Sequence, residues 1–273
     1  MATKPFSEPI GAASKQIPIR HIALVDLRAS LADGWRDFME MRGDILFLAI
    51  LYPLIGIIAA VATLGGSLLP LFLPIAAGVG LLGPVAAIGF YEMARRREQG
   101  MHSNWSHFLD VRKRPSFEEL AAVSGLLLAI FALWLLAAGT LYIALFGWTE
   151  PESLSAFLTK VFTTSRGWAL ILIGGAVGAV FAVIVLGFSI VSMPMLVDCD
   201  VSARDAVVTS IHAARKNPGA ILRWGITVAT LLVAGSIPLF IGLAVVLPWL
   251  GYATWHLYTR LVDRTAIPGC GRD

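Results

Sequence analysis

The stretch LAAVSGLLLAIFALWLLAAGTLYIALFGW, residues 120–148, contains no Asp, Glu, Lys or Arg. A helix needs about 20 apolar residues to cross the roughly 30 Å hydrocarbon core of a bilayer, and this stretch exceeds that length. An uncharged apolar run of this size is typical of a transmembrane helix rather than of a soluble domain. The stretch therefore predicts a protein of the membrane class.

Four more apolar stretches of spanning length accompany it, at 45–64, 71–93, 168–191 and 220–257. The last is too long for one crossing. The sequence Gly235-Ser236-Ile237-Pro238 lies near its middle, where a proline would break a helix. We therefore predict an all-α, polytopic membrane protein with six transmembrane helices in three hairpins. An alternative keeps 220–257 as one long buried helix and has five spans.

The basic residues predict the orientation of these spans. All of the 21 Lys and Arg residues except Lys160 and Arg166 fall in the N-terminal segment, the loops after spans two and four with their margins, or the tail. By the positive-inside rule, both termini and both basic loops are cytoplasmic. The predicted organisation is a cytoplasmic segment at 1–43, a six-span domain at 44–262 and a cytoplasmic tail at 263–273.

Composition supports this class and argues against others. The chain is 57% apolar and only 14% charged, whereas soluble domains have about 25% charged residues. The net charge of +3 comes from the loops, so its expected partner is the lipid bilayer with its anionic headgroups, and no nucleic acid is predicted. The first 40 residues lack the features of a cleavable signal peptide, and the first span is expected to serve as the signal.

Two amphipathic helices are predicted on the cytoplasmic side. In 27–41, apolar residues recur at steps of three and four, and Trp35 and Phe38 are expected to contact lipid headgroups or the cytoplasmic face of the bundle. A second helix at 202–215 has Ser202 as its N-cap, and Asn217-Pro218 ends it. Each helix precedes a hairpin, which leaves open whether the three hairpins are repeats.

The ionisable residues indicate no site for chemistry. The span interiors have none, which weighs against ion-coupled transport, and Glu92 is interpreted as a solvated ion pair with Arg95 and Arg96. Four of five histidines lie in polar segments, and His256 has no histidine or carboxylate partner within a turn of its own helix, so no metal or cofactor site is predicted. Hydrolase and nucleotide-binding motifs are absent from the sequence, so no enzyme is predicted.

The two cysteines are also interpreted as chemically inert. Cys199 and Cys270 both lie in segments predicted to be cytoplasmic, where thiols stay reduced, and they form no C-x-x-C pair. We therefore expect two free thiols.

Small residues and prolines indicate how the spans pack. Gly174 and Gly178 lie four residues apart and would let helices approach closely, either within the bundle or at a homodimer face. Because the sequence does not decide between these two positions, it leaves the oligomeric state open. Pro194 is expected to bend or end span four.

Several motifs go beyond generic membrane character. The run VSMPMLVD at 191–198, followed by Ala206, Ser210 and Asn217-Pro218, resembles bacterial integral membrane proteins of the domain of unknown function 2189 family. The run LPWLGYATWHLY at 247–258, which includes Trp255 and His256, is similar to the same family. So are Gly34-Trp35 with Asp37-Phe38, and the 83–96 region, which extends the likeness over about residues 20–262. Tyr252 departs from the pattern, in which His is common.

The resemblance implies a six-span protein of the bacterial inner membrane without an established activity. Some relatives are labelled putative cytochrome c oxidases, but this chain lacks the membrane-embedded histidines that haem and copper would need. We expect a non-enzymatic accessory, assembly or scaffold component of a membrane complex. The alternative is a permease or flippase-like carrier of an apolar or zwitterionic small molecule. The residues selected for packing or interaction are Trp35, Phe38, Gly174, Gly178, Pro194, Asn217, Trp255 and His256.

Overall fold

The computed structural model describes residues 17–49, 54, 69–71, 74–75, 80–148, 153–238, 240–267 and 270. Every named element in these residues is a helix, and an isolated antiparallel bridge joins Ile19 to Val262. The predicted all-α class is therefore confirmed. The α-helices are α1 (Leu24–Ala49), α4 (Gly83–Ala86), α5 (Ile88–Glu98), α6 (Phe117–Phe146), α7 (Leu154–Thr163), α8 (Ser165–Ser189), α9 (Ser192–Asp198), α10 (Ala203–Lys216), α11 (Pro218–Ser236) and α12 (Leu243–Leu261).

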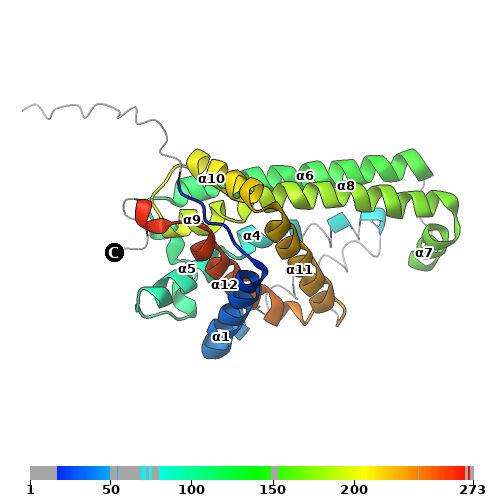
Figure 1. Ribbon diagram of the computed structural model, residues 1–273. Helices are drawn as coiled ribbons and strands as arrows, with labels where there is room; N and C mark the ends of the chain where they lie inside the picture. The colour runs from blue at the N-terminus through cyan, green and yellow to red at the C-terminus, as the bar shows by residue number, and fades with distance from the viewer. Residues whose placement is uncertain are drawn as a thin grey trace, which may run out of the picture.

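Two parts can be distinguished in the fold. The helices α6 and α8 extend side by side away from a compact group made of α1, α5, α9, α10 and α12 (Figure 1). We call this compact group the helical base. Short 3-10 helices complete it, at Trp105–His107 (η2), Asp110–Lys113 (η3) and Arg264–Ala266 (η4), and another lies at Leu69–Leu71 (η1).

The α6–α8 hairpin is held by close helix packing. A Cβ atom added to Gly178 would lie 3.2 Å from the ring of Trp134 on α6, and one on Gly174 would lie 3.6 Å from Leu141. Both glycines therefore face α6. Of the two alternatives left open by the sequence, packing within the bundle or a homodimer face, the structure shows the first. The helix α7 lies across the far end of the hairpin (Figure 1), where Phe157 packs against Tyr142.

The predicted break around Pro194 is confirmed. The helix α8 ends at Ser189 and α9 begins at Ser192, because the ring of a proline excludes a regular helix through the preceding turn. The freed backbone N–H of Val191 donates to Ser210 Oγ at 3.1 Å. This contact joins the break to α10, whose first turn is capped by Ser202 as predicted, with Ser202 Oγ accepting from the Asp205 N–H at 3.1 Å.

A tight turn separates α11 from α12, as the Gly-Ser-Ile-Pro sequence predicted. Gly235 and Gly242 approach each other so closely that a Cβ atom on Gly242 would lie 2.7 Å from the Gly235 carbonyl oxygen. Phe240 adopts a φ of 65° within the turn. The alternative of one long helix over 220–257 is therefore wrong.

The helical base is centred on the second half of α12. Tyr252, Trp255, Leu257 and Tyr258 are almost completely buried there. The helix α12 lies directly against α1, since a Cβ atom on Gly34 would lie 2.4 Å from the backbone nitrogen of Ala253. The amphipathic helix predicted at 27–41 is thus part of α1, which continues without a break to Ala49 and past the boundary predicted at residue 43.

Three of the described helical segments are long and apolar enough to cross a membrane: Phe117–Phe146, the combined α8–α9 segment Ser165–Asp198, and Pro218–Ser236. They correspond to predicted spans three, four and five. Most of predicted span one lies outside the described residues, as do residues 72–73 and 76–79 of span two, whose described remainder includes α4 and the first half of α5. Predicted span six corresponds to α12, which is not among the three. The second half of α12 is packed inside the helical base.

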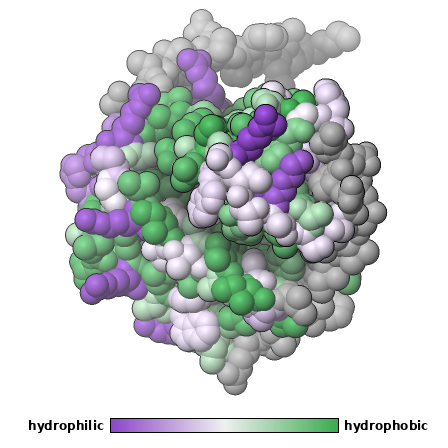
Figure 2. Space-filling view, turned by 90° about the vertical axis from the view of Figure 1, so that its right-hand side faces the viewer, coloured by the Kyte–Doolittle hydropathy of each residue, from purple (hydrophilic) through white to green (hydrophobic). Residues whose placement is uncertain are grey.

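The surface is broadly apolar away from the helical base. Figure 2 views the molecule from the end at which α7 lies and shows wide hydrophobic areas between separate hydrophilic side chains. Trp148, at 87% exposure, and Trp168 lie at this end of the hairpin. Aromatic side chains at the ends of apolar helices are typical of the boundary between lipid and water.

Candidate functional site

Three of the selected residues, Trp35, Phe38 and His256, lie where α1 packs on α12. Phe38 is buried, whereas the Trp35 ring is 40% exposed and packs 5.4 Å from Phe38 and 5.1 Å from Trp249, measured between ring centroids. The Trp249 Nε1–H donates to the Leu31 carbonyl at 2.8 Å. The amphipathic face of α1 therefore lies on a neighbouring helix, which was one of the two positions expected for it.

His256 has a carboxylate partner that its own helix does not supply. Its Nε2 lies 2.7 Å from Asp37 Oδ2 on α1. The sequence search covered one turn of the histidine's own helix and could not find a partner on another helix. Arg97 on α5 approaches the other oxygen of Asp37 at 3.1 Å and also pairs with Glu40. Three helices are thus joined by one histidine, two carboxylates and one guanidinium.

A second ion pair joins the same helices one turn further along. Arg260 Nη2 lies 2.5 Å from Asp33 Oδ2, and Arg260 Nη1 donates to Ser30 Oγ at 3.3 Å. Partial burial opposes ionisation of Asp33, but the hydrogen bond and charge of Arg260 hold the pKa of Asp33 below its usual value. Asp33 is therefore a stable anion that fixes α1 against α12.

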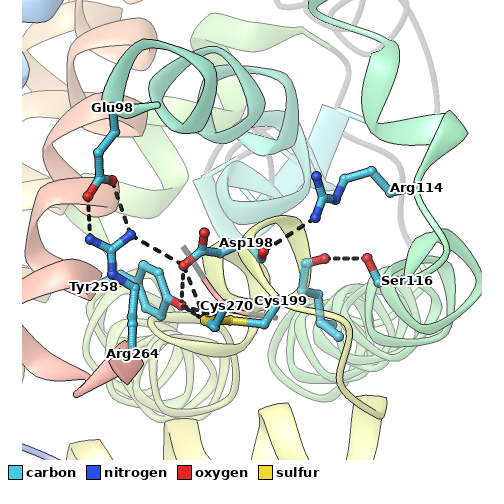
Figure 3. Close-up of a disulfide and its surroundings, with 9 residues drawn as sticks. Glu98, Arg114, Ser116, Asp198, Cys199, Tyr258, Arg264 and Cys270 are labelled. Carbon is cyan, nitrogen blue, oxygen red and sulfur yellow. Dashed lines mark hydrogen bonds and ion pairs between the residues drawn. A yellow bond between two sulfur atoms is a disulfide. The ribbon is translucent and has the colours of Figure 1, made fainter. Parts of the chain in front are cut away.

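Trp255 begins a second polar group. Its Nε1–H donates to Glu98 Oε2 at 3.0 Å, and Arg264 Nη1 donates to the same oxygen at 3.1 Å. Figure 3 shows this group from Glu98 and Arg264 onward. Arg264 also reaches Asp198 Oδ2 at 3.4 Å, and the Tyr258 hydroxyl donates to that oxygen at 2.9 Å. Residues of α5, α9, α12 and η4 therefore converge on the buried carboxylate of Asp198.

The two cysteines lie beside this carboxylate and form a disulfide between Cys199 and Cys270. The expectation of two free thiols is therefore wrong in this structure. Both residues are buried, and the Tyr258 hydroxyl lies 3.4 Å and 3.7 Å from their sulfur atoms. Sequence spacing could not predict the pairing, because 71 residues separate them.

A third polar group surrounds Glu92 on α5. The Glu92 side chain is only 1% exposed and binds both Arg95 and Arg96 at 2.9 Å, so its interpretation as a solvated pair is wrong. Arg96 continues to Asp110 at 2.8 Å. Hydrogen bonds from Lys113 and His107, opposed weakly by burial, lower the pKa of Asp110 to about 2.

Asn217 connects the N-terminal segment to the joint between α10 and α11. Its Oδ1 accepts from the Ile22 N–H at 3.0 Å, and its Nδ2 donates to the Arg20 carbonyl at 3.1 Å. The Arg20 N–H in turn donates to the Leu261 carbonyl at 2.8 Å. Asn217 therefore positions residues 17–23 between α10 and the end of α12, a role that its place before a proline did not reveal.

The selected residues do not form a single site. Trp35, Phe38, Trp255 and His256 meet in the helical base, Asn217 lies at its edge, Pro194 lies within α9, and Gly174 and Gly178 lie along the hairpin. Sequence reasoning did not select Asp37, Glu98, Asp198 and Arg264 as site residues. Asp37 and Asp198 lie in the runs at 34–38 and 191–198 that resemble the family, whereas Glu98 and Arg264 had no such signal.

Apolar helices of spanning length above a base of paired charges define a helical integral membrane protein. The comparison with known families agrees: residues 71–198 match the family described as predicted integral membrane protein (DUF2189). Residues 71–198 therefore place this part of the chain in the family. The runs at 34–38 and 247–258 lie outside the matched residues. No curated protein and no solved structure matches the chain.

Proposed function

We propose that this protein is a non-enzymatic accessory, assembly or scaffold component of a membrane complex, in the bacterial inner membrane with both termini and the helical base on the cytoplasmic side. The observation that carries the proposal is the division between an internally bonded base and outward-facing apolar helices. In the base, Asp33, Asp37, Glu92 and Glu98 are each held by arginines of the same chain. Charges used in this way stabilise one arrangement of helices and are not arranged around a substrate.

The apolar helices supply the surface for an accessory role. Along α8 and α11, large apolar side chains point away from the rest of the chain, among them Leu172, Val180, Val183, Ile226 and Val233. Gly175 also faces open space, since a Cβ atom added there would meet no heavy atom within 4 Å. Such a face can pack against lipid or against the helix of another membrane protein.

A carrier is the alternative, and one groove favours it. This groove, of about 570 Å³, lies where α4, α5 and η3 meet the start of α6. Its lining is almost entirely apolar and includes Val85, Phe108, Phe117, Leu120 and Leu128. It could receive an apolar group, although it lies at one end of α6 and a carrier needs access from both sides of the membrane.

Site-specific photocross-linking in cells tests the proposal. A photoreactive residue replacing Val180 should capture one protein reproducibly and in stoichiometric yield, because this side chain is 59% exposed. The matched control replaces Leu127, which is fully buried and should yield only cross-links within the chain. Cross-links to lipid alone, together with solute movement by the purified protein in liposomes, would favour the carrier instead.

A further inference from the structure

The buried group around Asp198 contains the donor atoms of a metal site. One carboxylate oxygen of Asp198 and the sulfur atoms of Cys199 and Cys270 lie within 4.8 Å of one another, and all three residues are buried. Two sulfurs and one carboxylate form a donor set suited to Zn²⁺, which takes thiolate, imidazole and carboxylate ligands in tetrahedral sites.

The two oxygens of Asp198 differ in their surroundings. Oδ2 accepts from the Tyr258 hydroxyl and from Arg264, whereas Oδ1 is buried without a hydrogen-bond partner among the described residues. Oδ2 is also the oxygen beside the sulfurs, since it lies 3.4 Å from Cys270 Sγ, so it is the atom that would bind a cation held by these three residues. The unpartnered Oδ1 shows that the hydrogen-bonding capacity of this buried carboxylate is not filled by the described residues.

We propose that the reduced protein binds one Zn²⁺ through Asp198, Cys199 and Cys270. The disulfide and the metal exclude each other, because a thiolate must have a free electron pair and no sulfur partner to act as ligand. The spacing of these residues did not indicate a site, because they come from the end of α9 and from the tail after η4.

Neighbouring residues fit the role of supporting the ligands. Metal-bound carboxylates are usually held by a further hydrogen bond, and the Tyr258 hydroxyl supplies it to Asp198 at 2.9 Å. Arg264 offsets part of the negative charge of two thiolates and a carboxylate, and Glu98 holds Arg264 in place. Three protein ligands leave a fourth position for a water molecule.

Metal titration of the full chain, purified in detergent and reduced with a phosphine, tests the proposal. We expect one Zn²⁺ per chain by elemental analysis and protection of both thiols from alkylation when Zn²⁺ is present. Co²⁺ as a probe should give the intense visible bands of a tetrahedral site and a thiolate charge-transfer band. Reduced protein with two accessible thiols and no bound Zn²⁺ would refute the proposal, and so would a disulfide that persists in the reductant.

Variants separate binding by these ligands from binding elsewhere. Cys270→Ser should weaken the thiolate-to-Co²⁺ charge-transfer band, because one of the two sulfur ligands is lost, and should abolish the binding of one Zn²⁺ per chain. Asp198→Asn should weaken Zn²⁺ binding while leaving the hydrogen bond from Tyr258 in place. Tyr258→Phe should lower the affinity about 10- to 100-fold, the usual effect of losing a supporting hydrogen bond. His212→Ala, a control at an exposed position of helix α10, should change nothing. If Cys270→Ser bound Zn²⁺ as well as the wild type does, the assignment would be wrong.

Discussion

Replacing Gly34 by alanine should destabilise the helical base, although alanine is the better helix former. A Cβ atom at this position would lie 2.4 Å from the backbone nitrogen and 2.6 Å from the Cα atom of Ala253. Backbone atoms cannot rotate away as a flexible side chain would, so α1 and α12 must move apart. Overpacking usually costs about 1–3 kcal/mol, and a clash with backbone belongs at the upper end.

The helix propensity of alanine opposes this cost by about 1 kcal/mol. The expected net loss is therefore about 2 kcal/mol, or roughly 5 °C in the unfolding midpoint for a chain of this size. The matched control is Gly175→Ala, because nothing lies within 4 Å of a Cβ atom there and only the gain in propensity should appear. Thermal unfolding in detergent, followed by tryptophan fluorescence, measures both. Equal midpoints for the two variants would refute the close contact between α1 and α12.

Three further predictions concern topology, burial and pH. Reporter fusions after residue 67, within 150–166 and after residue 236 should report the periplasm, and fusions after 105, 205 and 270 the cytoplasm; a periplasmic C-terminus would contradict the six-span arrangement. Glu92→Gln should cost about 3–5 kcal/mol, because it leaves a buried arginine uncompensated, while Arg36→Gln, at an exposed pair, should stay within about 0.5 kcal/mol in the same unfolding assay. The pKa of Asp110 is lowered from 3.8 to about 2, so its contribution should be complete above pH 3.8 and disappear as the pH falls through about 2. The difference in unfolding midpoint between wild type and Asp110→Asn should shrink over that range, and a difference that grew on acidification would contradict the assignment.

Local chemistry predicted much of the fold. The apolar runs at 117–146, 165–189 and 218–236 form helices because each satisfies its own backbone hydrogen bonds, and Ser202, Pro194 and the Gly-Ser-Ile-Pro turn mark helix boundaries through contacts within a few residues. Apolar runs, N-caps and proline or glycine breaks can all be recognised in a single sequence. From them, most ends of these helices were predicted within a few residues of their positions in the structure.

The polar groups of the helical base could not be predicted in the same way. Asp37 lies 219 residues from His256, and Glu98 lies 157 residues from Trp255. From the sequence alone, the two carboxylates are indistinguishable from surface charges and Trp255 from an interfacial aromatic residue. Their roles become visible only when the partner helix is in position. The same holds for α12, which was predicted as a span from the apolar stretch 220–257, whereas its second half is buried against other helices of the same chain. Tertiary contacts, rather than periodicity, decided these positions.

The packing of α1 on α12 also determines when the protein can finish folding. Ribosomes synthesise about 5–20 residues per second, so roughly 10–40 s pass between the appearance of Gly34 and that of Ala253. Throughout that interval the buried side chains of α1, including Leu27 and Phe38, have no partner helix to cover them. The first helix to be made therefore waits for the last, and a chain that stops before α12 exposes an apolar face of α1 that chaperones and proteases can recognise.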